Sequence, residues 1–140
     1  MSTVNAMSDF LEEALAKHVL GGAAYTQPTP RLALFKSPVT DANLEANVQT
    51  NEVATGIGYT RQAITFNAPT NPGGVSTNAA LITFSTATAA WGTVTHFALV
   101  DSATIGAGQV LIYGQLDNSK VVDIDDVFQL PATNLSITFA

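Results

Sequence analysis

The chain has 140 residues, of which 46% are hydrophobic and 11% are charged, and its formal net charge is −6 at pH 7. This length is typical of a single domain that can bury a substantial core. Only five Lys and Arg residues are scattered along it, which argues against nucleic-acid binding because basic side chains must neutralise the phosphates. The absence of cysteine excludes disulfides, thiolate metal ligands and cysteine nucleophiles.

The charged fraction is well below the roughly 25% that is typical of soluble domains. Because the cores of protein interfaces are depleted of charge, this composition favours a subunit packed against neighbours over a free monomer. No stretch approaches the ~18 continuous apolar residues of a membrane span, so no membrane insertion is expected. The first residues lack the basic-then-apolar pattern of a signal peptide, and we expect a protein made in the cytoplasm.

An amphipathic helix is predicted over residues 8–20. Residues recurring at helical spacing form its apolar stripe: Phe10, Leu11, Ala14, Leu15, His18 and Val19. Ser8 or Asp9 is expected to cap its start, and Gly21-Gly22 is expected to end it, since glycine readily adopts the left-handed conformation. This stripe must be buried against the rest of the chain or against a neighbour.

From residue 31 onward the pattern changes to short alternating runs separated by turn formers. The predicted strands are 31–36, 61–66, 79–84, 94–100, 110–116, 120–124 and 135–139, with turns at 67–74, 101–108 and 117–119. This pattern predicts a mainly β protein, an antiparallel β-sandwich of jelly-roll-like form with one N-terminal α-helix. We expect a single domain over 1–140, with the sandwich at 31–140. The polar segment 37–58 is predicted to be a long loop, either mobile or an arm that contacts a neighbour.

The run 91–100 contains the only tryptophan and one of the two histidines. Counting from Val94, one face of this predicted strand carries Val94, His96, Ala98 and Val100, and the other carries Thr95, Phe97 and Leu99. We expect Trp91 and Phe97 to be buried. Catalysis by His96 would need a nucleophile and an orienting carboxylate, but no serine lies in a Gly-x-Ser-x-Gly elbow and Asp101 is best explained as a turn residue. His96 is therefore expected to be structural.

Other patterns could carry chemistry but lack the required spacing. The acidic run 123–126 does not match a calcium-binding loop, and 56–58 and 106–108 lack the further residues of nucleotide-binding loops, so all three are expected to be turns. His18 and His96 belong to different elements. Three carboxylates lie in the polar segment with nothing to fix their geometry: Asp41, Glu45 and Glu52. We expect no enzymatic activity, no cofactor, and no catalytic or metal site.

Two segments carry recognisable sequence blocks. The first combines a Ser-Asp-Phe-Leu-Glu helix start at 8–12 with a Gly-Gly-Ala-Ala-Tyr-Thr turn at 21–26, and the second is the block 87–101 around Trp91. Weaker matches follow in order at 58–66, 113–116, 119–120 and 135–139. Together they cover nearly the whole chain and resemble a family of small tailed-phage virion proteins, the phage tail fiber proteins. The chain departs from the family pattern at 48–55 and 123–126.

The resemblance implies a non-enzymatic structural component of the virion, produced in the host cytoplasm, most readily a tail fiber or tail-associated protein. The alternatives are capsid decoration and a receptor- or glycan-binding module. Expected partners are other copies of the chain, with a trimer as the leading expectation, other phage virion proteins and, for the last alternative, a host surface receptor. Contacts are expected through the helix or the segment 37–58. No binding residue carries over from the family; Tyr25, Tyr59 and Tyr113 are candidate glycan contacts but are expected to be half-buried packing residues.

Overall fold

The computed structural model of the chain describes residues 3–4, 6–69 and 74–138. Its elements in chain order are β1 (Thr3–Val4), β2 (Ala6–Met7), α1 (Asp9–Leu20), β3 (Arg31–Lys36), α2 (Asp41–Glu45), β4 (Gln62–Ala63), β5 (Val75–Thr77), β6 (Ile82–Thr83), β7 (Gly92–Val100), β8 (Val110–Val122), β9 (Gln129–Leu130) and β10 (Ser136–Thr138). The predicted mainly β character, with a helix near the N-terminus, is confirmed.

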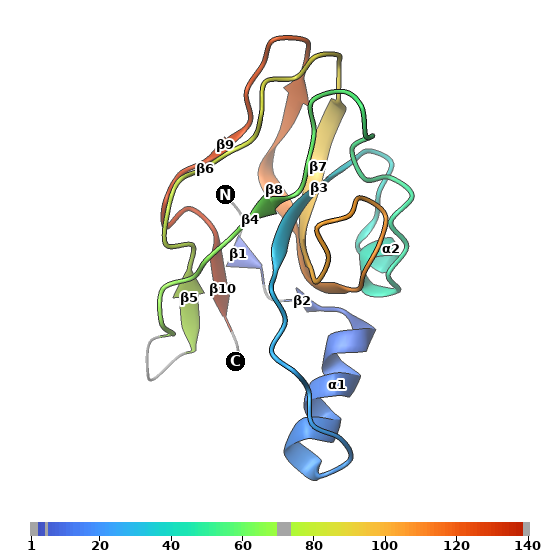
Figure 1. Cartoon of the computed structure of the whole chain (residues 1–140), viewed down its shortest axis with the longest axis vertical. Helices are drawn as coiled ribbons and strands as arrows, with labels where there is room; N and C mark the ends of the chain where they lie inside the picture. The colour runs from blue at the N-terminus through green and yellow to red at the C-terminus, as the bar shows by residue number, and fades with distance from the viewer. Residues whose placement is uncertain (1–2, 5, 70–73, 139–140) are drawn as a thin grey trace.

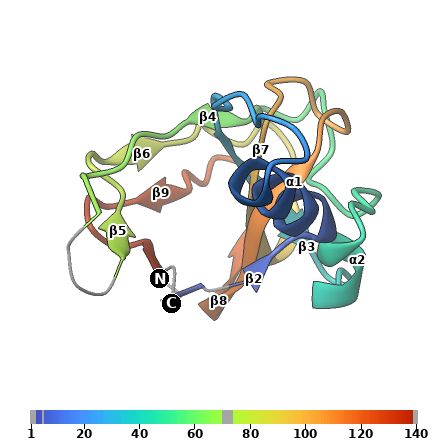
Figure 2. The same ribbon diagram turned by 90° about the horizontal axis from the view of Figure 1, so that it is seen from below.

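The strands form a five-stranded antiparallel sheet that faces two shorter sheets. The large sheet has the order β2-β8-β7-β3-β4, and the shorter ones are β1-β10-β5 and β6-β9. All pairings are antiparallel except that of β1 with β10. The shorter sheets lie together on one side of the large sheet (Figures 1 and 2), and the main hydrophobic cluster joins residues from both layers.

Helix α1 begins and ends where the sequence predicts. The Ser8 hydroxyl caps it by accepting a hydrogen bond from the Leu11 N–H at 3.2 Å, and Gly21 ends it in the left-handed conformation with φ of 90°. Ser8 also fixes the helix to β8, because its N–H donates to the Leu111 carbonyl and its hydroxyl donates to the Val110 carbonyl. Only the first part of α1 is anchored in this way, and the helix stands out from the sheets (Figure 1).

The predicted break between two strands at 117–119 is wrong, because β8 runs through it. The register of β8 against β7 shifts there: Val94 pairs with Lys120, whereas His96 pairs with Gln115. Four residues of β8 therefore lie opposite one residue of β7, and the turn formers occupy this irregularity without reversing the chain.

Two predicted strands are shorter than expected. Of 61–66 only Gln62–Ala63 pair as β4, and of 79–84 only Ile82–Thr83 pair as β6. The buried side chain of Asn78 explains the second difference: it donates to the Ala80 and Pro131 carbonyls and accepts from the Leu135 N–H. These side-chain hydrogen bonds replace the regular backbone hydrogen bonds between strands at this point. Strand 31–36 is confirmed as β3, and of 135–139 residues 136–138 form β10, with 139 outside the described residues.

The segment 37–58, predicted to be a long loop or arm, contains α2, and its first part packs on the outer face of the large sheet, whereas Val53 joins the main hydrophobic cluster. Thr40 and Asn43 form a reciprocal capping box at the start of α2. Leu44 is fully buried in a second hydrophobic cluster on that face, together with Phe35 and Val100. The two hydrophobic clusters thus lie on opposite faces of the five-stranded sheet.

A bulge in β7 decides which face each of its side chains occupies. Against β3, Phe35 pairs with His96 and Lys36 pairs with Val94, so Thr95 is an extra residue on β7. Val94 therefore joins the main cluster with Phe97, while His96 turns toward α2 and Ala98 joins the second cluster. The prediction that Val94 and His96 share a face is wrong, because an irregularity of this kind shifts the two-residue alternation.

Trp91 is a core residue, as predicted. Its side chain and that of Phe97 are each 1% exposed. The indole N–H donates to the Ile57 carbonyl at 2.9 Å, and the ring meets Tyr59 and Phe84 edge to face at 5.4 and 6.1 Å between centroids. The indole therefore packs between the segment that precedes β4 and the residue that follows β6.

Replacement of Trp91 by alanine should lower the free energy of unfolding by about 3–5 kcal/mol, because a large cavity would remain between the sheets. Urea denaturation followed by far-ultraviolet circular dichroism measures this loss. The matched control is Leu81→Ala, since Leu81 is 56% exposed and its truncation removes little buried area. Equal losses for both variants would contradict the core role of Trp91.

Candidate interaction surfaces and buried polar sites

Arg61 holds a guanidinium group whose five N–H donors all have acceptors, although the residue is only 4% exposed. Nε donates to Glu52 Oε2 at 2.8 Å, and Nη2 donates to Glu52 Oε1 at 2.6 Å and to Gln49 Oε1 at 2.8 Å. Nη1 donates to the carbonyls of Ser102 and Ala107, both at 2.8 Å. The bidentate ion pair and the two carbonyl contacts join the loop after β7 to the segment that precedes β4.

The carboxylate of Glu52 likewise has all of its hydrogen-bond acceptor sites filled. Besides Arg61, its Oε2 accepts from the Tyr59 hydroxyl at 2.7 Å, and its Oε1 accepts from the Gly106 N–H at 3.1 Å. The Tyr59 hydroxyl in turn accepts from the Leu34 N–H at 3.0 Å, and burial, followed by the nearby Glu52 carboxylate, raises the pKa of Tyr59. A carboxylate has about four lone-pair sites. All are used here, so Glu52 has no free acceptor for a substrate or a metal ion.

His96 has a carboxylate partner that the sequence did not reveal. Its Nε2 lies 3.1 Å from Asp41 Oδ1, and its Nδ1 lies 2.9 Å from Thr95 Oγ1. The sequence analysis did not identify this carboxylate, because α2 brings Asp41 to His96 across 55 positions of sequence. Both ring nitrogens are occupied, so the imidazole links α2 to β7. Asp101 is a turn residue as predicted, with its Oδ1 accepting from the Gln109 N–H at 2.7 Å.

The acidic and glycine-rich runs form turns, as predicted. Asp126 accepts from the Asp123 N–H through its side chain at 2.9 Å and donates its own N–H to the Asp123 carbonyl at 3.1 Å. The glycines that bound 56–58 and 106–108 all have positive φ. Within residues 3–4, 6–69 and 74–138, no group of three or more His, Cys, Asp or Glu side chains is placed to hold a metal ion.

Two of the three candidate tyrosines are buried, and the third is half-buried. Tyr59 and Tyr113 are 2% and 6% exposed. Tyr25 is half-buried, as expected, and its hydroxyl oxygen is buried with no hydrogen-bond partner in the described part of the chain. Burial and, secondarily, the carboxylate of Asp101 raise the pKa of Tyr25. This hydroxyl therefore stays protonated near neutral pH and can donate one hydrogen bond.

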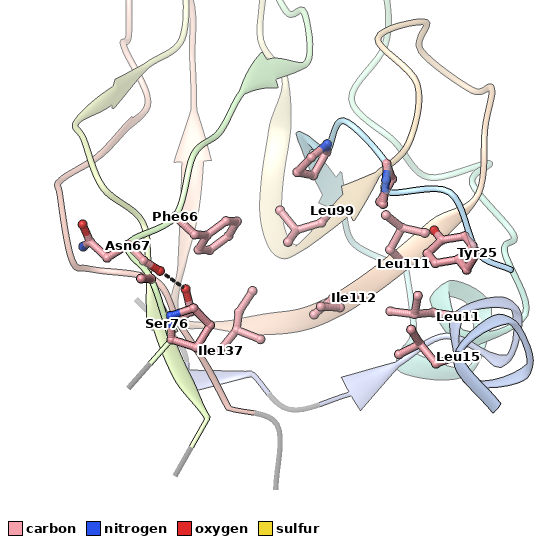
Figure 3. Close-up of a pocket in the computed structure, with 14 residues that line it drawn as sticks. Leu11, Leu15, Tyr25, Phe66, Asn67, Ser76, Leu99, Leu111, Ile112 and Ile137 are labelled. Atoms are coloured by element: carbon pink, nitrogen blue, oxygen red, sulfur yellow. Dashed lines mark hydrogen bonds between the residues drawn. The ribbon is translucent and has the colours of Figure 1, made fainter. Parts of the chain in front are cut away.

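Tyr25 lies at the wall of an apolar groove of about 410 Å³ (Figure 3). The groove opens between α1 and the sheet that contains β10. Apolar side chains from several elements form most of its walls: Leu11, Leu15, Pro28, Pro30, Phe66, Leu99, Leu111, Ile112 and Ile137. Walls of this kind accept an aliphatic or aromatic group.

Other apolar side chains are exposed on the surface of the molecule. Val19 and Leu20, at the end of α1, are 75% and 84% exposed. Val121, Ile124 and Val127, around the connection from β8 to β9, are 63%, 60% and 47% exposed. Groups of exposed aliphatic residues are typical of surfaces that bind another protein.

Removal of the Arg61 side chain should be strongly destabilising, because it leaves the Glu52 carboxylate buried and unpaired. Arg61→Ala is expected to lower the free energy of unfolding by about 3–5 kcal/mol. The double variant Glu52→Gln/Arg61→Met should lose less than the sum of its single variants, as measured in a double-mutant cycle by urea denaturation. Glu13→Gln is the control, since Glu13 forms an exposed ion pair with Lys17, and its unfolding midpoint should stay unchanged. A strictly additive cycle would contradict the coupling.

No helix in the described part of the chain is long and apolar enough to cross a membrane. No curated protein matches the chain. A family model described as Gp80, podophage GP4 fiber I protein gp80, matches residues 6–138, which is nearly the whole sequence. This match confirms the resemblance to phage fiber proteins that the blocks at 8–26 and 87–101 indicate. The chain therefore belongs to the podophage GP4 fiber I protein gp80 family of phage fiber proteins.

Proposed function

We propose that this protein is a non-enzymatic structural subunit of a phage tail fiber, or of a tail-associated fiber, that assembles through repeated contacts with its own copies and with other virion proteins. The family match over residues 6–138 is the observation that carries the proposal. The low charged fraction of 11% supports it, because repeated subunit contacts bury surface that a free monomer would keep charged. Each fiber repeats the same contact many times, so modest interfaces add up.

The side chains that could act in catalysis are already engaged in hydrogen bonds, which supports a structural role. Glu52 has all its acceptor sites filled, both ring nitrogens of His96 are engaged, and Asp101 closes a loop. A general base needs a lone pair that can reach a substrate. In this chain these groups hold the backbone in place.

A glycan-binding role through the candidate tyrosines has less support than a structural role. Sugar-binding sites present aromatic rings to solvent, whereas Tyr59 and Tyr113 are buried and the hydroxyl of Tyr25 is turned into the protein. The apolar groove beside Tyr25 suits an aliphatic group better than a polyhydroxylated sugar. These observations favour contacts between proteins.

Antibodies against this protein, detected by gold labelling on purified particles in the electron microscope, should bind at the tail. The family match predicts a position in a fiber. An antibody added to purified particles reports the position of the protein without disturbing assembly. Labelling over the capsid surface would replace the proposal with capsid decoration. Intact particles that lack the protein altogether would contradict a virion role.

Size-exclusion chromatography with multi-angle light scattering should give the mass of a homo-oligomer. A trimer, with three copies of the 14.6-kDa chain, is the leading expectation because fiber subunits assemble symmetrically. Measurements over a hundredfold range of protein concentration distinguish a stable oligomer from weak self-association. A monomer at every concentration would contradict self-assembly in solution.

A further inference from the structure

One tyrosine of β8 lies where the two helices approach each other, on the outer face of the large sheet. Tyr113 belongs to the second hydrophobic cluster, together with Leu44 of α2. It also pairs with Ala6 of β2, two residues before Ser8, which caps α1. Figures 1 and 2 both show α2 beside the first turn of α1. Both helices therefore approach the Tyr113 side chain.

Four carboxylates at the ends of these helices surround the tyrosine. Asp9 and Glu12 are in the first turn of α1. Asp41 and Glu45 are the first and last residues of α2. Burial raises the pKa of Tyr113, and all four carboxylates raise it further, Glu45 most strongly, because negative charge nearby opposes formation of the phenolate. We call the four carboxylates together with the Tyr113 hydroxyl the acidic patch.

The acidic patch is not neutralised by the chain itself. Asp41 is bonded to the His96 imidazole. In the part of the chain that the structure describes, the carboxylates of Asp9, Glu12 and Glu45 have neither a hydrogen bond nor an ion pair. Like charges at one site repel one another, and a cation that approaches them relieves this repulsion. The patch is therefore a place where a cation from outside the chain would bind.

The Tyr113 hydroxyl also points to a ligand. The residue is only 6% exposed. Its hydroxyl makes no hydrogen bond within residues 3–4, 6–69 and 74–138, and it is not among the buried polar atoms there, so it reaches the surface of the patch. A phenolic oxygen can accept a hydrogen bond from a cation while its own O–H donates to a carboxylate. The hydroxyl thus supplies a further acceptor at the centre of the patch.

A lysine ammonium suits the acidic patch better than a metal ion or a guanidinium. Within the described ranges, no three acidic or histidine side chains are placed to hold a metal ion. A guanidinium is best matched by one carboxylate that it binds through two parallel bonds, whereas the patch distributes its carboxylates around one hydroxyl. An ammonium is a compact charge whose three donors can point to separate acceptors.

We propose that the acidic patch is a docking surface for a lysine-bearing segment of another virion protein, with a lysine ammonium bound between the carboxylates and the Tyr113 hydroxyl. The proposal rests on the proposed function, because it specifies the chemistry of one contact that holds this subunit in the fiber. Contacts between copies of the chain use other surfaces. The partner supplies the positive charge that the patch lacks, so salt weakens the contact.

A fluorescein-labelled hexalysine peptide is the probe for the patch, with binding measured by fluorescence anisotropy in 0.1 M NaCl. The triple variant Asp9→Asn/Glu12→Gln/Glu45→Gln removes three charges with little change of shape and should weaken binding about tenfold. Glu45→Gln alone leaves α1 unchanged and should weaken binding about twofold. The fluorescence of Trp91 checks that each variant is folded.

The matched control is the triple variant Asp123→Asn/Asp125→Asn/Asp126→Asn. It removes the same charge from three exposed positions in the connection between β8 and β9, and asparagine tolerates the φ of 70° at position 125. Its effect on binding should be less than about twofold, because salt screens charges that lie beyond the Debye length of about 10 Å. Equal weakening by the two triple variants would overturn the proposal, since the peptide would then respond only to net charge.

Tyr113→Phe separates the hydroxyl from the ring. The ring stays in the second hydrophobic cluster, and the hydroxyl has no partner among the described residues, so the free energy of unfolding should be unchanged. The affinity for hexalysine should fall several-fold, because a hydrogen bond to the ammonium is lost. An unchanged affinity would overturn the placement of the ammonium at the hydroxyl.

Carbodiimide cross-linking of purified particles identifies the partner, because it joins a carboxylate to a lysine amine that touches it. Mass spectrometry should find Asp9, Glu12 or Glu45 joined to a lysine of a different protein. A lysine of a second copy of this chain, or no cross-link from these three carboxylates, would overturn the proposal. If the protein still labels the tail in that case, the structural role stands and the partner binds elsewhere. Absence of the protein from the particles would contradict the proposed function itself.

Discussion

The buried ion pair between Arg61 and Glu52 is the constraint on which much of the remaining structure depends. A guanidinium and a carboxylate removed from water are costly unless every donor and acceptor is satisfied. Here the satisfying groups come from the loop after β7, from the chain before β4 and from Tyr59. Those segments must therefore be in place before the pair is stable, and the pair in turn fixes their positions.

The same pair places the segment 37–58 against the large sheet. Glu52 and Gln49 are held by Arg61, and the Val53 N–H donates to the Leu34 carbonyl at 3.1 Å. His96 adds a second attachment through Asp41 on α2. Polar contacts thus cover the outer face of the sheet with a segment whose own sequence is weakly patterned. Because these polar groups are engaged inside the protein, they are not free to bind a partner.

The sequence predicted the elements whose signals are local. The ends of α1 were correct because Ser8 and Gly21 act within one helical turn. Strand 31–36 and the burial of Trp91 followed from alternation and residue size. The predicted break at 117–119 failed, because turn formers can also sit in an irregular pairing whose existence depends on the partner strand. The bulge that places Val94 and His96 on opposite faces also depends on pairing with a neighbouring strand, so the sequence of the strand itself does not reveal it.

The sequence by itself determined the mainly β character, the N-terminal helix, the lack of cysteine chemistry and the family of fiber proteins to which the chain belongs. Composition, periodicity and ordered motifs carry this information without any knowledge of distant contacts. Only the tertiary structure decided which partners the buried polar side chains bind. It also decided where the exposed apolar side chains lie. The partners of Arg61 and His96 lie up to 55 residues away along the chain. Pairings over such separations depend on how the strands pack, so no local pattern in the sequence specifies them.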